Sequence, residues 1–243
     1  MLVTSKRKKM KYYFGGYCFM KMQPLKFGSH FDSLVYSASD CINDNLVGTW
    51  AYTWTTNNNA GIDQIKNEFL ISDNTVSEIR QWIDKKFEEK KIGWHDLFAE
   101  IETVIEYKQK FYSHLTDLKI FALYFNEAEA NCLIQEFNPI GDKEGAIGLH
   151  QILSEKIVEK ESVNEKTIGF DLIGVEFGGD FHSFHCHDLG KNLSVKFGLT
   201  LNNSGLFEPH FNWKPVLDYL NNEENGFEPV PWFVVKVNLI TIE

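Results

Sequence analysis

The chain has 243 residues, a formal net charge of −10 and 43% hydrophobic residues. This length suffices for one large domain or two small ones, and the composition is that of a globular protein rather than of a disordered chain. No apolar run approaches the ~20 residues that a membrane-spanning helix needs. We therefore expect no membrane partner, and a cytoplasmic location follows as the default.

The N-terminus is basic. Residues 1–31 carry seven Lys or Arg and no acid, with "SKRKKMK" as the densest stretch. Two interpretations of residues 1–9 stay open: a disordered basic extension, or a start annotated too early, in which Met10 begins the protein and the preceding purine-rich codons are a ribosome-binding site. From Met10 to Glu243 we expect a single domain, because no repeat, low-complexity tract or Pro/Gly-rich linker divides the chain.

The N-terminal third has the composition of short strands and turns. "YYFGGYCF", "SLVYSA" and "TWAYTWTT" combine aromatic and β-branched residues between Gly, Asp and Asn breaks. Such runs predict strands, and "NNNAG" at 57–61 predicts a loop between elements.

The middle of the chain has helical periodicity. A T-x-x-E capping box at Thr75 and Glu78 predicts a helix that Gly93 ends, and a second helix follows from about Trp94. "LKIFALYF" at 118–125 predicts a buried strand. Asn126 and Glu129 then cap a short helix through residue 137, and "GLHQILSEKIVEK" at 148–160 predicts another amphipathic helix.

The last third returns to β structure. "IGFDLIGVEF", "GGD" and "FHSFHCHDL" predict a strand, a tight turn and a second strand. Short helices are expected around 191–198, ending at Gly198, and from Asn212 through about Leu220. "PWFVVKVNLITI" predicts a closing strand. Together these elements indicate an α+β fold: one domain with a mixed, mostly antiparallel sheet and packed amphipathic helices.

The stretch "FHSFHCHDLG" places three histidines, Cys186 and an aspartate within seven positions. On a regular strand, alternation puts His185 and His187 on one face, about 6.6 Å apart at their Cα atoms. Two such histidines can share a zinc ion, as H-x-H does on a carbonic anhydrase strand. The third ligand would come from His150, His210 or Asp171, none of which has a diagnostic spacing.

Two other interpretations of the histidine stretch stay open. Cys186 and a histidine distant in sequence could form a nucleophilic pair. Alternatively, the histidines bond locally within a hairpin or line a contact surface. The remaining signatures for nucleotide binding or catalysis are missing: no Walker loop, nucleophile elbow or Rossmann glycine pattern occurs. The four cysteines form no CxxC pair, so we expect buried thiols.

The remainder of the chain is strongly acidic. Residues 32–243 hold 17 bases against 34 acids, a net charge of −17. Such a body repels nucleic acid and suits a basic protein partner, because complementary potential speeds encounter and fixes register.

Two segments carry a resemblance to a known group of proteins. "SASDCINDNLVGTWAYTWTT" at 37–56 and "GFDLIGVEFGGDFHSFHCHDLGKNLSVKFGLTLNNSGLF" at 169–207 resemble cytosolic immunity proteins encoded beside toxins in bacterial polymorphic-toxin loci. The resemblance covers about a quarter of the chain. It implies a protein that binds and neutralises one cognate toxin without catalysis or cofactor, and it carries over no site residues. The alternative that stays open is a metal-dependent hydrolase using His185, His187 and a zinc ion.

Overall fold

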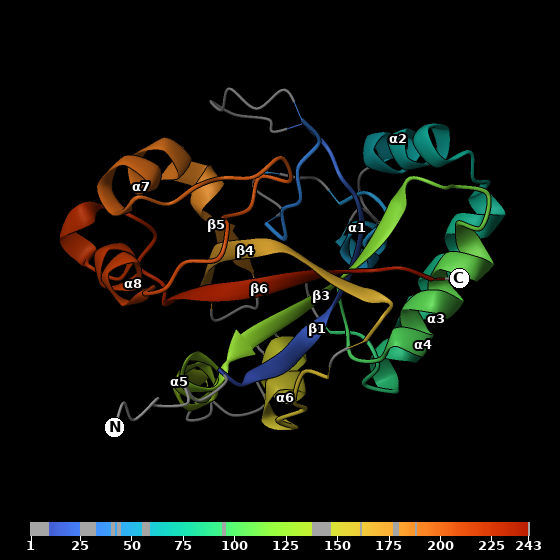
Figure 1. The fold of residues 1–243 in the computed structure, drawn as a ribbon. Coiled ribbons are helices and arrows are strands. Elements are labelled where there is room, and N and C mark those ends of the chain that lie inside the picture. Colours follow the sequence, from blue (N-terminus) through green and yellow to red (C-terminus); the bar gives the residue numbers. More distant parts are fainter. Residues whose placement is uncertain are drawn as a thin grey trace, which may run out of the picture.

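A six-stranded sheet with the strand order β2-β1-β3-β6-β4-β5 organises the molecule (Figure 1). The computed structural model describes residues 10–24, 33–39, 42, 45–54, 59–93, 96–137, 147–160, 162–176, 180–187 and 189–242. Every described strand pair is antiparallel. Helices pack around this sheet, and the expected α+β fold is confirmed.

The strands alternate along the chain with groups of helices. The strands are β1 (Tyr12–Lys21), β2 (Leu97–Phe98), β3 (Leu118–Asn126), β4 (Glu165–Val175), β5 (Phe181–Ser183) and β6 (Trp232–Ile240). The α-helices are α1 (Thr49–Trp54), α2 (Asn59–Phe69), α3 (Asp73–Glu88), α4 (Ile101–Phe111), α5 (Glu127–Phe137), α6 (Ile147–Ser154), α7 (Leu189–Phe197) and α8 (Lys214–Leu220). Short 3-10 helices cover Phe184–His187 and Glu223–Asn225.

Two glycines bend the long strands. The β1–β3 register shifts between Phe14 and Gly16, and the β4–β6 register shifts between Thr167 and Gly169. Both glycines have positive φ, +127° and +152°, which side chains of L-residues rarely allow. Such bulges increase local twist, so the sheet curls and can carry separate helix groups.

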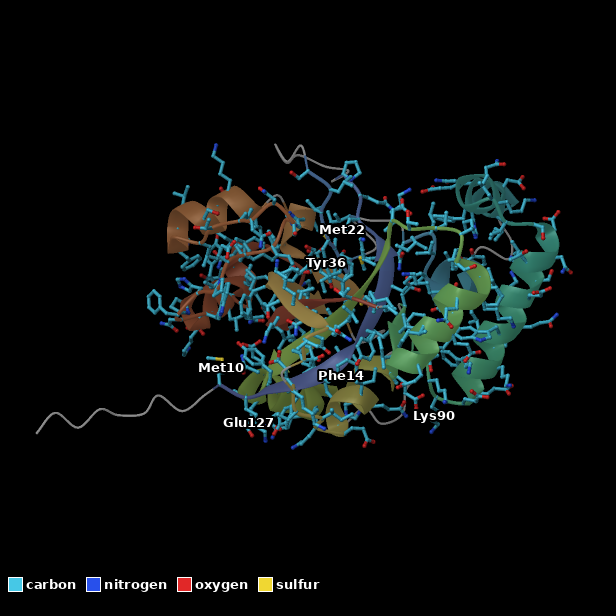
Figure 2. The ribbon with its side chains drawn as sticks, turned by 45° about the vertical axis from the view of Figure 1, so that its right-hand side comes forward. Met10, Phe14, Met22, Tyr36, Lys90 and Glu127 are labelled. Carbon is cyan, nitrogen blue, oxygen red and sulfur yellow. The ribbon has the colours of Figure 1, made fainter. Side chains whose placement is uncertain are left out.

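Three apolar clusters fill the space between sheet and helices. One joins α1, α2, α3 and α4 to the ends of β1 and β3, on the right of Figure 1. A second lies between α7, α8 and the strands β4 and β6, on the left. The third spans the middle of the sheet with α5 and α6, and it includes Tyr36 from the segment 33–39 (Figure 2).

The helices α3 and α4 begin at other residues than the sequence predicted. The helix α3 starts at Asp73, and the hydroxyl of Ser72 accepts the Thr75 amide as its N-cap, so the Thr75–Glu78 capping box is wrong by one turn. It ends at Glu88, before Gly93. The next helix, α4, starts at Ile101 rather than near Trp94, because β2 intervenes and pairs with β1.

The first third contains helices where strands and a loop were predicted. Thr49–Trp54, the first six residues of "TWAYTWTT", form α1 rather than a strand, and the last three residues of the NNNAG stretch belong to α2, which begins at Asn59. Within "SLVYSA", Val35 makes only an isolated bridge to Gln23 among the described residues. Residues 1–9 lie outside the described residues.

Residues 155–160 leave the predicted helix. The helix α6 ends at Ser154, and the following segment runs along β1, where Phe14 N donates to Ile157 O and Glu159 N donates to Tyr12 O. Glu159 then pairs with Lys236 of β6, and both side chains are mostly buried. This ion pair attaches the segment to the sheet.

Several other predicted elements are confirmed, whereas only Phe181–Ser183 of the predicted strand "FHSFHCHDL" form a strand, and most of the predicted "GGD" turn lies outside the described residues. The strands β3 and β6 lie where the apolar runs placed them. Asn126 Oδ1 accepts from the backbone of Ala128 and Glu129 at the start of α5, and α7 ends before Gly198. Within the described residues, no helix combines the length and apolarity needed to cross a membrane.

Candidate functional site

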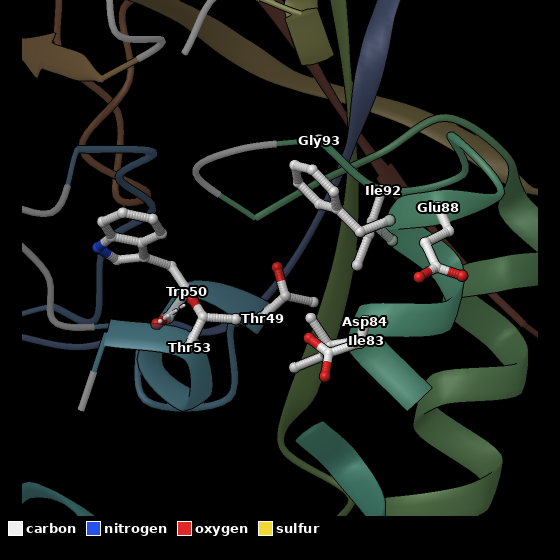
Figure 3. Close-up of a pocket in the computed structure, with 9 residues that line it drawn as sticks. Thr49, Trp50, Thr53, Ile83, Asp84, Glu88, Ile92 and Gly93 are labelled. Carbon is white, nitrogen blue, oxygen red and sulfur yellow. Dashed lines mark hydrogen bonds between the residues drawn. The ribbon is translucent and has the colours of Figure 1, made fainter. Parts of the chain in front are cut away.

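A cavity of about 420 Å³ opens between α1, the last turns of α3 and the segment 92–93 (Figure 3). We call it the α1–α3 cavity. Its lining comes from these three segments: Thr49, Trp50, Thr53, Ile83, Asp84, Phe87, Glu88, Ile92 and Gly93. Its size lies within the range of pockets that enclose small ligands.

A buried aspartate positions the α1 wall of the cavity. Asp96 accepts hydrogen bonds from the Trp50 amide at 2.7 Å, the Thr49 hydroxyl at 3.2 Å and the Asn45 amide group at 2.9 Å. These donors include a backbone N–H at the start of α1, where a carboxylate also complements the helix dipole. Gly48 allows this approach, because a Cβ there would lie 1.9 Å from Asp96.

The other end of α1 is held by α3. Arg80 donates from Nε to the Tyr52 carbonyl at 3.1 Å, and the Tyr52 side chain is fully buried beside Tyr112. A helix of six residues has little stability of its own. Asp96 and Arg80 therefore hold α1 in place and set the position of Trp50.

Two carboxylates line the α3 wall without a counter-charge. Asp84 and Glu88 are exposed, lie one helical turn apart, and form no hydrogen bond or ion pair with the described part of the chain. Like charges at this spacing destabilise a helix by about 0.2–0.5 kcal/mol. They also lie in the last turns of α3, where the helix dipole is negative and disfavours acids.

Three of the nearby lysines are engaged by other acids. Lys85 and Lys86 pair with Glu89, Lys86 also pairs with Glu106 at 2.8 Å, and Lys91 pairs with Glu100 at 3.0 Å. None of these three lysines therefore neutralises Asp84 or Glu88.

The apolar part of the wall contains two aromatic side chains. Trp50 is half-buried and Phe87 is 39% exposed, and Ile83 and Ile92 of the same lining are buried. Aromatic faces attract cations, and the attraction strengthens where water is excluded. The combination of aromatic walls and unpaired carboxylates can bind a cationic group.

A second cavity of about 470 Å³ adjoins the first and shares Ile92 and Gly93 with it. It lies against α6, and its charged and histidine side chains are Lys90, Glu100, His150 and Glu155. Lys90 lies at the edge of the molecule (Figure 2). The two cavities flank the segment 92–93, and their combined lining has more acidic than basic side chains.

Of the predicted histidine pair, His185 and His187, His185 is not among the described residues that line either cavity. The local structure of the pair also differs from the expected strand. The strand β5 ends at Ser183, and Phe184–His187 form a 3-10 helix. With about three residues per turn, side chains two positions apart in such a helix do not share a face. The predicted alternation of His185 and His187 on one strand face is therefore wrong.

His185 is buried, and its Nε2 lies 2.8 Å from the Gly205 carbonyl oxygen. A carbonyl only accepts, so Nε2 carries a proton and a metal would have to bind through Nδ1. The His187 side chain lies outside the described residues. Zinc binding by the pair thus stays a prediction.

The three candidate third ligands are separated in the fold. His150 lines the cavity at α6, His210 contacts the rings of Phe211 and Trp213, and Asp171 is buried in β4. Among the described residues, no three His, Cys, Asp or Glu side chains are placed to hold a metal ion.

Cys186, in the 3-10 helix, contacts one residue nearby in the sequence and one distant residue. Its Sγ lies 3.4 Å from the Ser39 hydroxyl and 3.4 Å from the Ser183 amide. The prediction of buried thiols holds for Cys18 and is wrong for Cys132, which is exposed on α5, while Cys41 lies outside the described residues.

Comparison of the chain with protein-family models, with curated proteins and with solved structures finds no match.

Sequence patterns did not single out the residues of the α1–α3 cavity. Trp50 belonged to an expected strand, and Glu88 to an "EEKK" run with the pattern of a solvated helix face. The available signal was Asp84 and Glu88 four residues apart at the end of a helix, where a base would be favoured.

Proposed function

We propose that this chain is a non-catalytic binding protein of the immunity type, which neutralises a cognate bacterial toxin in the cytoplasm by covering a basic surface. The observation that carries the proposal is the α1–α3 cavity, with Asp84 and Glu88 unpaired beside Trp50 and Phe87. Large aromatic side chains surrounded by matched charge are typical of residues that dominate protein–protein affinity.

The charge of the whole chain supports the same proposal. With a net charge of −17 over residues 32–243, the body attracts basic proteins over distances of about a Debye length, ~8 Å at physiological salt. Long-range attraction brings a basic partner to the surface, and the cavity then provides a local contact that fixes its register.

The α1–α3 cavity offers charged and aromatic groups that can bind a partner. Asp84 and Glu88 are exposed, and no described histidine, cysteine or lysine lines this cavity. A stoichiometric inhibitor needs affinity and fast association, which these groups can provide.

The test is capture of the tagged chain from the organism that encodes it, without chelator, followed by native mass spectrometry. We expect a one-to-one complex with a basic protein. That protein, expressed alone, should arrest growth, and co-expression of this chain should restore it.

A captured protein without effect on growth, or an arrest that this chain does not relieve, would contradict the proposal. A bare chain carrying one zinc ion would instead favour the hydrolase alternative with His185 and His187.

A further inference from the structure

The chemistry of the α1–α3 cavity restricts what can occupy it. Three features of its wall attract positive charge: the Asp84 and Glu88 carboxylates, the negative end of the α3 dipole, and the aromatic faces of Trp50 and Phe87. In the unbound protein the two carboxylates repel each other at the negative end of this helix, and the lysines of its last turn, Lys85 and Lys86, pair with Glu89 and Glu106 instead of with them. A cation that enters the cavity removes this repulsion, so its binding is favoured beyond direct contact.

The apolar lining favours one kind of cation. Ile83 is 2% exposed and Ile92 is 5% exposed, so any group that enters deeply loses water on those sides. A lysine ammonium is compact and strongly hydrated, whereas a guanidinium is planar, more weakly hydrated and able to stack on an aromatic ring while its edges donate hydrogen bonds. Two carboxylates at neighbouring turns offer acceptors for such a group from one side.

We propose that the α1–α3 cavity accepts an arginine side chain of the protein partner, with the guanidinium stacked against Trp50 or Phe87 and bonded to Asp84 and Glu88. This inference rests on the proposed function for the presence of a protein partner, but the recognition of arginine is a property of the cavity itself. Proteins that lack an exposed arginine at the complementary position are then poor partners, however basic they are.

The probe is N-acetyl-arginine methylamide, titrated into the full chain and followed by 1H–15N correlation spectra. The Trp50 indole signal is assigned with Trp50→Phe. We expect saturable shifts of this signal and of the amides of 84–93, with a dissociation constant of about 1 mM, the scale of a single anchored side chain. The lysine analogue should bind at least threefold more weakly, and the citrulline analogue, which has the same shape without the charge, should not bind.

Variants separate the cavity from general charge. Asp84→Asn with Glu88→Gln should weaken arginine binding at least tenfold, whereas Glu78→Gln, an exposed residue of α3 outside the cavity lining, should leave it unchanged. Equal binding of arginine and citrulline, equal or tighter binding of lysine, or no effect of the double substitution would overturn the inference.

These outcomes are separable from failure of the proposed function. Arginine binding without any captured toxin would leave the cavity chemistry standing and remove the immunity role. A captured and neutralised toxin, together with absence of arginine binding, would retain the function and remove the cavity as an arginine site.

Discussion

Asp171 is a buried acid without a side-chain partner in the described structure. It is 1% exposed on β4, and neither carboxylate oxygen has a hydrogen-bond partner from a described side chain. Burial raises the pKa of Asp171 to about 7, although a backbone hydrogen bond at Leu172 acts in the opposite direction. Tyr36, also buried, has its pKa raised by burial and by the nearby Cys18 and Asp171.

This raised pKa makes the stability of the fold depend on pH. In the unfolded chain an aspartate titrates near pH ~3.9, so folding is not penalised below that pH and loses stability as the pH rises toward about 7. The loss amounts to about 4 kcal/mol on the scale of ~1.36 kcal/mol per pKa unit. Glu129, whose pKa burial raises to about 7 against hydrogen bonds from Val234 and Asn126, adds to the same trend.

Asp171→Asn should flatten this dependence. We expect the free energy of unfolding, measured by urea denaturation, to match that of the wild type near pH ~4, where the buried carboxyl is also neutral, and to exceed it by up to about 4 kcal/mol at pH ~8. The exposed Asp84→Asn serves as the control and should retain the wild-type slope. A wild-type stability that does not change across this pH range would contradict the assignment.

The helix α1 shows why part of the site could not be predicted from sequence. Its residues "TWAYTW" are β-branched or aromatic except for one alanine, and they favour a strand by propensity. The helix forms because Asp96 binds its first turn, Arg80 binds the Tyr52 carbonyl, and Tyr52 is buried. Asp96 lies 46 residues after Trp50, so no local pattern contains this information.

Asp96→Ala should release α1. The substitution leaves the Thr49 hydroxyl and the Trp50 amide without their acceptor, and a buried unpaired donor costs about 1–3 kcal/mol. We expect a loss of about 2–4 kcal/mol in urea denaturation, together with loss of the arginine-induced shift of the Trp50 indole. Asp96→Asn retains one acceptor oxygen and should lose less. Equal stability of Asp96→Ala and the wild type would show that α1 does not depend on this contact.

The elements that were predicted correctly contain their signals locally. The strands β3 and β6 are mostly apolar runs, and the caps at Asn126 and Gly198 lie within one turn of the helices they bound. The 3-10 helix at Phe184–His187 has no such local signal. His185 is held by the Gly205 carbonyl, and Phe184 packs against Phe207. Contacts 20 or more residues away override the strand pattern there.

The attachment of the segment 155–160 to the sheet through Glu159 and Lys236 can be tested by substitution. Lys236 pairs with Glu159, and Asn238 donates to both Glu159 and Glu165. Lys236→Met leaves a mostly buried carboxylate without its cation, and breaking a buried pair costs about 3–5 kcal/mol. The Lys236 and Glu159 side chains are 16% and 19% exposed, so we expect about 3 kcal/mol in urea denaturation.

Adding Glu159→Gln to Lys236→Met should recover part of this loss, because the uncompensated charge is removed. A double variant less stable than Lys236→Met would show that the attachment does not act through charge.

The whole molecule combines the long-range negative potential of its acidic body with one local contact site, the α1–α3 cavity. If the field accelerates encounter, raising the salt concentration from about 50 to about 500 mM should slow association with the captured basic partner by about tenfold and change dissociation much less. Stopped-flow or surface-based kinetics can measure both rates. An association rate independent of salt would contradict a role for the acidic body.

The most direct test of the account compares two equal changes in charge on α3. Glu88→Lys places a base in the α1–α3 cavity one turn after Asp84, and the attraction between the new ammonium and Asp84 should stabilise the helix by about 0.5 kcal/mol. Glu78→Lys makes the same charge change outside the cavity lining. We predict that calorimetric titration with the captured partner shows at least a hundredfold loss of affinity for Glu88→Lys and less than a threefold loss for Glu78→Lys, with both variants folded. Similar affinities for the two variants would contradict the claim that the partner binds at this cavity.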